Sequence, residues 1–115
     1  MGVYQSFDAS IASFSSLSNA VDLSMSHGKN FLVIPSMTSN SEVYLRAADS
    51  MAGTYRAVYH PPINSSTVAV NRFIVPSAIT NAVVEIPNGL RYVKVETSAT
   101  VSFTAGFQII CGGTY

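Results

Sequence analysis

The sequence predicts an all-β protein, an antiparallel β-sandwich of jelly-roll type with eight or nine strands. Apolar and polar residues alternate with a period of two through most of the chain, and clusters of Gly, Pro, Asn and Ser recur about every ten residues. No segment shows helical periodicity over about ten residues or more. We expect one domain over residues 1–115, in which residues 1–10 form an N-terminal arm.

The alternation first becomes clear in residues 17–25. Apolar side chains mostly occupy the odd-numbered positions and serines the even-numbered ones, whereas a helix would place Leu23 away from the other apolar residues. This pattern predicts a half-buried strand, followed by a turn at residues 26–30. The apolar run "FLVIP" at residues 31–35 then predicts a strand buried on both faces.

Further strands are predicted downstream. The Asn88-Gly89 pair is a typical two-residue turn, so residues 82–97 are expected to form a β-hairpin. The last strand is expected to carry Phe103 and Phe107 on its core-facing side. The predicted strands after the first two are residues 42–47, 54–60, 67–75, the two arms of 82–97, and 100–111.

Composition excludes several partner classes. Six basic and six acidic residues give zero net charge with no basic stripe, so we expect no nucleic acid. No polybasic segment, long apolar span or signal peptide is visible, so we expect no membrane. Only 10% of residues are charged, and charge-poor surfaces are typical of protein interfaces. A single cysteine, Cys111, fits a reducing cytoplasm.

The sequence offers no pattern typical of catalysis or metal binding. Both histidines, His27 and His60, lack Cys, Asp or Glu partners at ligand spacing. Cys111 lies on an apolar strand face, where a buried thiol is expected rather than a nucleophile. We therefore expect a protein that is not an enzyme and that holds no metal or other cofactor.

Aromatic and basic residues form the candidate interface. Tyr and Arg are enriched at binding hot spots, and aromatic rings also stack on sugars. Tyrosines that pair across strands would instead stabilise the sheet, and both interpretations remain open. The candidate interface residues are Tyr44, Tyr55, Arg56, Tyr59 and Tyr92.

Five segments together resemble small virion proteins of tailed bacteriophages, the capsid decoration (cement) or neck accessory proteins. They are "SLSNAVDL", "KNFLVIPSM", "VYLRAADSMAGTYRAVY", "RFIVP" and "RYVKVETS", and they span roughly residues 17–98. The chain departs from the family in "PSMTSNSE", where the family has an aromatic residue after the proline-containing strand end. The resemblance implies a structural β-sandwich without catalytic residues.

"GLRYVKVET" is also similar to a strand of discoidin-like, galactose-binding-like sandwiches, which implies a glycan-binding module as the alternative. The first hypothesis is a virion structural protein, assembled in the bacterial host cytoplasm, that stabilises the particle as a capsid decoration protein. Its partners would be capsid or neck proteins of the same particle. A homo-oligomer is expected, and a trimer would suit capsid three-fold positions. A neck or tail accessory role is a further alternative.

Overall fold

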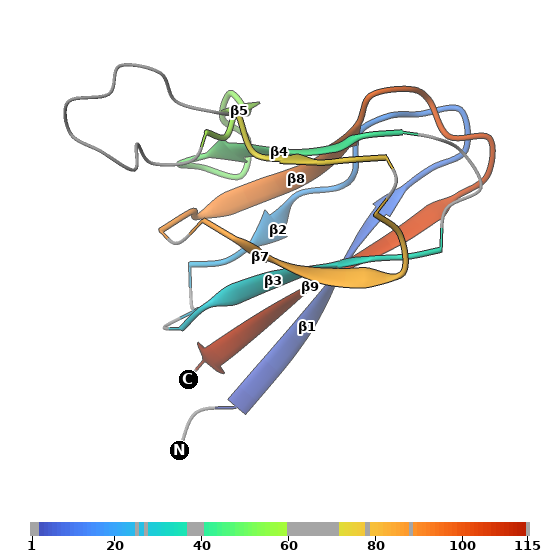
Figure 1. The fold of residues 1–115 in the computed structure, drawn as a ribbon. Coiled ribbons are helices and arrows are strands. Elements are labelled where there is room, and N and C mark those ends of the chain that lie inside the picture. The colour runs from blue at the N-terminus through green and yellow to red at the C-terminus, as the bar shows by residue number, and fades with distance from the viewer. Residues whose placement is uncertain are drawn as a thin grey trace, which may run out of the picture.

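A computed structural model describes residues 3–24, 26, 28–36, 41–59, 72–77, 79–87 and 89–114, with the side chains of all of these except residues 3, 4, 113 and 114. These residues form strands, turns and loops and no helix (Figure 1). The strands are β1 (Val3–Ile11), β2 (Val21–Asp22), β3 (Asn30–Ile34), β4 (Val43–Ala48), β5 (Arg56–Ala57), β6 (Ile74–Val75), β7 (Ala82–Ile86), β8 (Tyr92–Thr97) and β9 (Ala105–Thr114). The all-β prediction is confirmed for this part of the chain.

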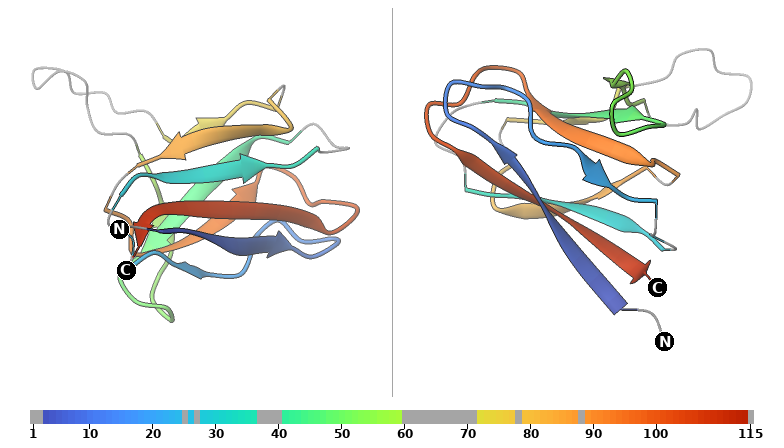
Figure 2. Two further views of the ribbon diagram at one scale, coloured as in Figure 1. Left: turned by 90° about the horizontal axis from the view of Figure 1, so that it is seen from below. Right: turned by 180° about the vertical axis from the view of Figure 1, so that it is seen from behind.

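The strands form two antiparallel sheets that lie one above the other (Figures 1 and 2). The first sheet has the order β1-β9-β3-β7, and the second has the order β2-β8-β4-β5, with β6 also pairing with β4. The second sheet contains three strands of only two residues each, namely β2, β5 and β6. Short strands alternating between two facing sheets are consistent with a β-sandwich.

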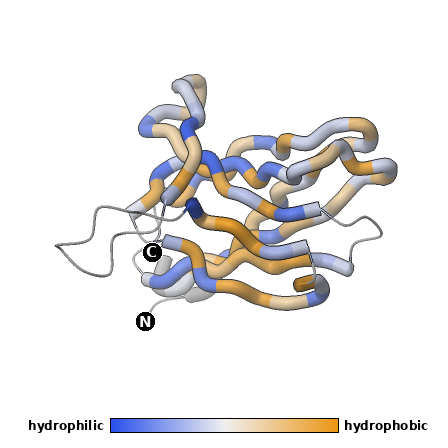
Figure 3. Tube along the Cα trace, turned by 45° about the horizontal axis from the view of Figure 1, so that its top comes forward, coloured by the Kyte–Doolittle hydropathy of each residue, from blue (hydrophilic) through white to orange (hydrophobic). Residues whose placement is uncertain are grey.

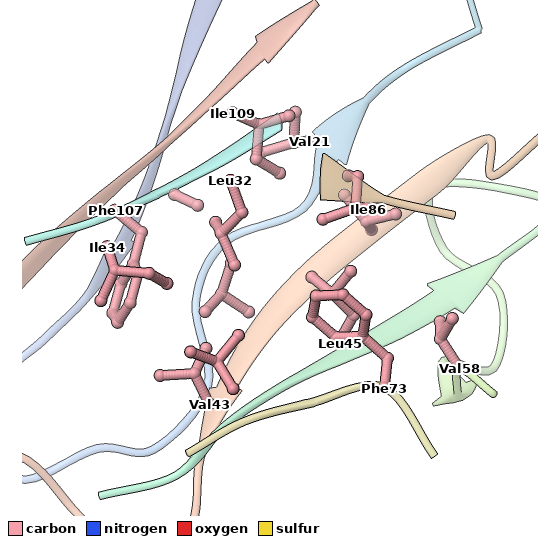
Figure 4. Packing of buried hydrophobic residues seen from close by; sticks show 14 of the residues in the cluster. Val21, Leu32, Ile34, Val43, Leu45, Val58, Phe73, Ile86, Phe107 and Ile109 are labelled. Atoms are coloured by element: carbon pink, nitrogen blue, oxygen red, sulfur yellow. The ribbon is translucent and has the colours of Figure 1, made fainter. Parts of the chain in front are cut away.

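The core lies between the two sheets (Figure 4). Leu32, Phe107 and Ile109 from the first sheet are fully buried there, as are Leu45 and Val95 from the second. Hydrophobic residues run along several strands of the trace (Figure 3), and buried positions alternate with more exposed ones along β4 and β8. The period of two therefore predicted correctly which side chains of β4, β8 and β9 enter the core.

The predicted hairpin over residues 82–97 is wrong. β7 pairs with β3 in the first sheet, whereas β8 pairs with β2 and β4 in the second. Gly89 has a φ of 85°, a turn conformation that glycine adopts without strain, while Asn88 lies outside the described residues. The turn signal correctly located a chain reversal. However, a local reversal does not fix whether the two arms pair with each other or face each other across the core.

Two other predicted strands have different bounds. In residues 17–25 only β2 and an isolated bridge between Leu17 and Glu96 are strand-like. Between them, the Ser18 hydroxyl oxygen accepts a hydrogen bond from the Val95 N–H at 2.8 Å, so a side chain replaces part of the ladder. β9 begins only at Ala105, and Phe103, expected in the core, is 75% exposed in the preceding loop.

The expected N-terminal arm lies instead in a sheet, because residues 3–10 belong to β1 and pair with β9. The run at residues 31–35 was expected to be buried on both faces, but β3 alternates between buried and half-buried residues. Of the strands predicted at residues 54–60 and 67–75, the structure describes residues 54–59 and 72–75, which contain the short β5 and β6. Residues 60–71 lie outside the described part, as do both histidines. No helix of the described residues is long and apolar enough to cross a membrane.

The connections gather at two ends of the sandwich. The loops β1–β2 and β8–β9 lie side by side at one end (Figures 1 and 2). The two chain ends lie at the opposite end, together with the connections β4–β5 and β7–β8 (Figure 1). The two ends of the sandwich therefore present different sets of side chains to solvent.

Candidate interaction surfaces

A network of charged side chains covers the solvent-facing side of the second sheet. Oε1 of Glu96 accepts hydrogen bonds from Nε of Arg46 and from Nη2 of Arg72, both at 3.0 Å. The side chains of these three residues are between 22% and 34% exposed. The register explains the arrangement, because Tyr44 lies opposite Glu96 on β8 and opposite Ile74 on β6, which brings three strands together here.

Two tyrosines extend this network. The guanidinium of Arg72 lies 4.3 Å from the ring centre of Tyr44, and Nζ of Lys94 lies 4.5 Å from that of Tyr55. Both are cation–π contacts, which favour a fixed orientation of ring and cation. The Tyr44 hydroxyl donates a hydrogen bond to the Glu42 carboxylate at 2.8 Å, and this bond raises the pKa of Tyr44.

The structure brings some of the predicted interface residues together and separates others. Tyr44 and Tyr55 meet the network directly, since Nη1 of Arg46 also donates to the Tyr55 carbonyl oxygen at 3.4 Å. Tyr59 pairs with Arg72 through an isolated bridge and is 52% exposed. Tyr92 lies opposite Ala48, at the other end of the β4–β8 pair, with the Arg91 guanidinium 5.5 Å from its ring centre.

Sequence reasoning missed Arg72 and the central place of Glu96. The alternation of β8 does place Lys94 and Glu96 on the face opposite Val93 and Val95. However, Arg72 is 24 residues from Glu96 in the chain, and no local pattern signals that contact. Nε of Arg72 is buried and has no hydrogen-bond partner among the described residues, so within them the network is not fully satisfied.

An open hollow of about 470 Å³, lined by both polar and apolar groups, lies at the end of the sandwich near the β4–β5 and β7–β8 connections. Arg56, the remaining predicted interface residue, lines it. Other residues around it include Asp49, Thr54, Leu90 and Arg91. A second hollow, of about 380 Å³, shares residues 89–91 with the first and continues to Ser24, Ser26 and Asn30. Hydroxyl, carboxylate and guanidinium groups thus surround space large enough for a small polar ligand.

An aromatic tip, formed by Phe14 and Phe103, occupies the opposite end. Phe14 is 82% exposed and Phe103 is 75% exposed. Their loops are joined by backbone hydrogen bonds, from the Phe14 N–H to the Val101 carbonyl at 2.6 Å and from the Val101 N–H to the Ser15 carbonyl at 2.9 Å. Residues 12–19 and 98–104 contain no charged residue. The tip is therefore apolar and aromatic within an uncharged polar rim.

Phe14 also has an unusual backbone conformation. Its φ is 64°, in the left-handed region that is rarely occupied by bulky residues. Strained residues persist where the surrounding structure holds them, and they cluster at binding sites. Nothing in the sequence pattern signals this conformation, because the alternation around Phe14 carries no turn-forming Gly or Asn.

The described residues contain no group of three or more His, Cys, Asp or Glu side chains that could hold a metal ion. Cys111 is fully buried on β9, and this burial raises the pKa of its thiol. Asp22 accepts hydrogen bonds from Ser24, including one from its N–H at 2.8 Å, and these lower the pKa of Asp22. This last contact forms a local turn after β2.

Comparison of the chain with protein-family models, with curated proteins and with solved structures gives no match.

Proposed function

We propose that this protein is a virion structural protein of a tailed bacteriophage, a capsid decoration protein that stabilises the particle through protein–protein contacts and performs no catalysis. The observation that carries the proposal is the aromatic tip, in which two phenylalanines are almost fully exposed on adjacent loops. Aromatic side chains that fill pockets of a partner are typical anchors of protein interfaces.

Burial of the tip by a partner would remove two large apolar side chains from water. Exposed apolar surface of this kind marks interaction sites. The strained backbone of Phe14 is held by the hydrogen bond from its N–H to the Val101 carbonyl, which fixes the position from which this side chain is presented. The uncharged rim also favours a protein partner, because charged residues are depleted at interface centres.

We also propose that the sandwich has jelly-roll connectivity, an architecture found in viral capsid and lectin domains. The strand pairs are nested in sequence, β1 with β9, β2 with β8, β3 with β7, and β4 with β5. Successive pairs also alternate between the two sheets. A long antiparallel ribbon that wraps around a core gives this order, which supports the proposal.

The first experiment measures copy number by quantitative mass spectrometry of purified virions. Hundreds of copies per particle are expected for capsid decoration, whereas a small number set by the neck or tail symmetry would indicate the accessory role. Absence from the virion would contradict both forms of the proposal.

A second experiment uses Phe14→Asn together with Phe103→Ser. Asn tolerates the left-handed conformation, so the Phe14 change is expected to raise the free energy of unfolding by about 0.5–1 kcal/mol. Binding of the double variant to particles that lack the protein is expected to fall at least about tenfold. Val83→Ser, on the exposed face of β7, is the control that should leave binding unchanged. Undiminished binding of the double variant would show that another surface makes the contact.

The open hollow near the β4–β5 and β7–β8 connections favours a second candidate function, a carbohydrate-binding module. Arg56, Arg91 and Asp49 surround it, and side chains of this kind form hydrogen bonds with sugar hydroxyls. Glycan-array binding that is lost in Arg91→Ala, Tyr55→Ala or Tyr59→Ala, and retained in the tip double variant, would favour this function over virion decoration.

A further inference from the structure

β1 has one open edge. One side of the strand pairs with β9 along a register that runs from Gln5 opposite Cys111 to Ile11 opposite Ala105. Among the described strands, none pairs with the other side. β1 contains neither Lys nor Pro, and its one charged residue is Asp8. Natural edge strands usually carry such residues because an unprotected edge is a template for another strand.

The side chain of Asn19 shows which backbone groups point to this edge. Its Oδ1 accepts a hydrogen bond from the Ser10 N–H at 2.9 Å, and its Nδ2 donates one to the Asp8 carbonyl oxygen at 3.0 Å. Backbone groups of alternate residues point to the same edge of a strand, so those of Ser6 and Tyr4 point there too. Asn19 therefore covers the edge from the Asp8 carbonyl oxygen to the Ser10 N–H, and it leaves open the Asp8 N–H and the outward groups of residues 4 and 6.

A bulge near the strand's start leaves this alternation intact. Val3 lies opposite Thr114 and Gln5 opposite Cys111, so the additional residue belongs to β9 and β1 keeps its regular pleat. The open segment continues toward the chain ends, where β1 and β9 extend beyond β3 (Figures 1 and 2). Ser6 and Asp8 are both exposed, so an approaching strand meets no covering side chain of the described residues.

We propose that β1 pairs with β1 of a second copy of this chain, antiparallel about a two-fold axis at Ser6. Ser6 would then lie opposite Ser6 of the second copy, and Asp8 opposite position 4. Because Asn19 already occupies the Asp8 carbonyl oxygen of each copy, the outward groups at positions 4, 6 and 8 would form about four new backbone hydrogen bonds. The pairing joins the two first sheets into one continuous sheet across an isologous contact.

The position of Asp8 makes β1 complementary to itself in this register. With the axis at Ser6, the Asp8 carboxylates of the two copies would be four residues apart along the strand direction, or about 13 Å. The one charged side chain of each strand therefore does not lie opposite the same charge of the second copy. A two-fold axis at Asp8 would place the two carboxylates directly opposite each other. The pairing does not depend on the virion role, since it uses only the backbone of β1.

The decisive variant is Ser6→Pro, compared with Ser6→Ala. Proline is tolerated on an edge strand where the N–H faces away from the sheet, so Ser6→Pro removes one outward donor from each copy and keeps the bonds to β9. Sedimentation equilibrium from about 1 µM to about 1 mM is expected to show a monomer–dimer equilibrium for the wild type and Ser6→Ala. The dissociation constant of Ser6→Pro should be at least about tenfold higher.

Hydrogen exchange of the wild-type amides tests the same contact without a variant. The Ser6 amide should become protected as the protein concentration rises, while the Ser10 amide, already bound by Asn19, should not change. This measurement decides the matter if Ser6→Pro fails to fold, which its circular dichroism would reveal. A wild type that remains monomeric over this range, a trimer, or a dimer unaffected by Ser6→Pro would overturn the proposal.

Discussion

The two sheets of the sandwich are stabilised in different ways. In the first sheet, β1 and β9 are nine and ten residues long and form a nearly continuous ladder of backbone pairs. In the second sheet, three strands have two residues each, so β4 and β8 provide most of the ladder. There the Glu96 carboxylate connects β4, β8 and Arg72 beside β6.

Backbone pairing and side-chain contacts can therefore substitute for each other in stabilising a sheet. A long ladder needs little help from its solvent-facing side chains, and the first sheet has only one ion pair among its described residues, between Lys29 and Glu85 at 3.9 Å. Short strands supply few backbone hydrogen bonds. The cation–π contacts and ion pairs of the second sheet therefore contribute a larger share of its stability. The predictions below test this contrast.

The largest effects are expected in the core that both sheets share. Phe107→Ala in the first sheet and Leu45→Ala in the second both truncate fully buried side chains. Each should lower the free energy of unfolding by about 3–5 kcal/mol, because it removes apolar contacts and leaves a cavity. Urea denaturation followed by circular dichroism and by tyrosine fluorescence would measure this. If the sheets form one cooperative unit, the two probes will give coincident transitions.

The matched pair Glu96→Gln and Glu85→Gln tests whether side-chain contacts stabilise the second sheet more than the first. Glu96 is 22% exposed and bound by two guanidinium groups, so its neutralisation should lower the free energy of unfolding by about 1–2 kcal/mol. Glu85 is 49% exposed in a long ion pair, and its neutralisation should cost less than about 0.5 kcal/mol. Equal effects in chemical denaturation would show that the network does not stabilise the second sheet.

Asn19→Ala tests the side-chain contact that supports the edge of the first sheet. It removes the bonds to Ser10 and Asp8, which are solvent-exposed, and should cost about 1 kcal/mol. Ser24→Ala, in the turn after β2, is a polar control outside this edge. Hydrogen exchange at Ser10 should accelerate in Asn19→Ala and stay slow in Ser24→Ala.

The smallest effect concerns the pH dependence of the second sheet. The pKa of Tyr44 is raised in the folded state by its hydrogen bond to the Glu42 carboxylate. Because the folded protein holds this proton more tightly than the unfolded chain, the contribution is complete below the ordinary pKa and is lost as pH rises through the folded value. Thermal melts above about pH 10 should therefore show a steeper loss for the wild type than for Tyr44→Phe.

The fold class and the inward-facing residues of several strands follow from the local sequence pattern. Alternation in β4 and β8 identified Val43, Leu45, Val93 and Val95 as core residues, because the side chains of a strand alternate between its two faces whatever it pairs with. The candidate tyrosines were likewise correctly placed on or beside strands, since aromatic residues suit a pleated, half-buried surface.

Which strands pair and which surfaces face solvent depend on contacts that form only in the folded chain. The turn at Gly89 looks the same in sequence whether its arms form a hairpin or, as here, cross between the sheets. Similarly, Phe103 continues the apolar alternation of β9 but lies outside the strand and is exposed. Local patterns fix the orientation of each side chain relative to its own backbone, whereas pairing depends on contacts between residues far apart in the chain.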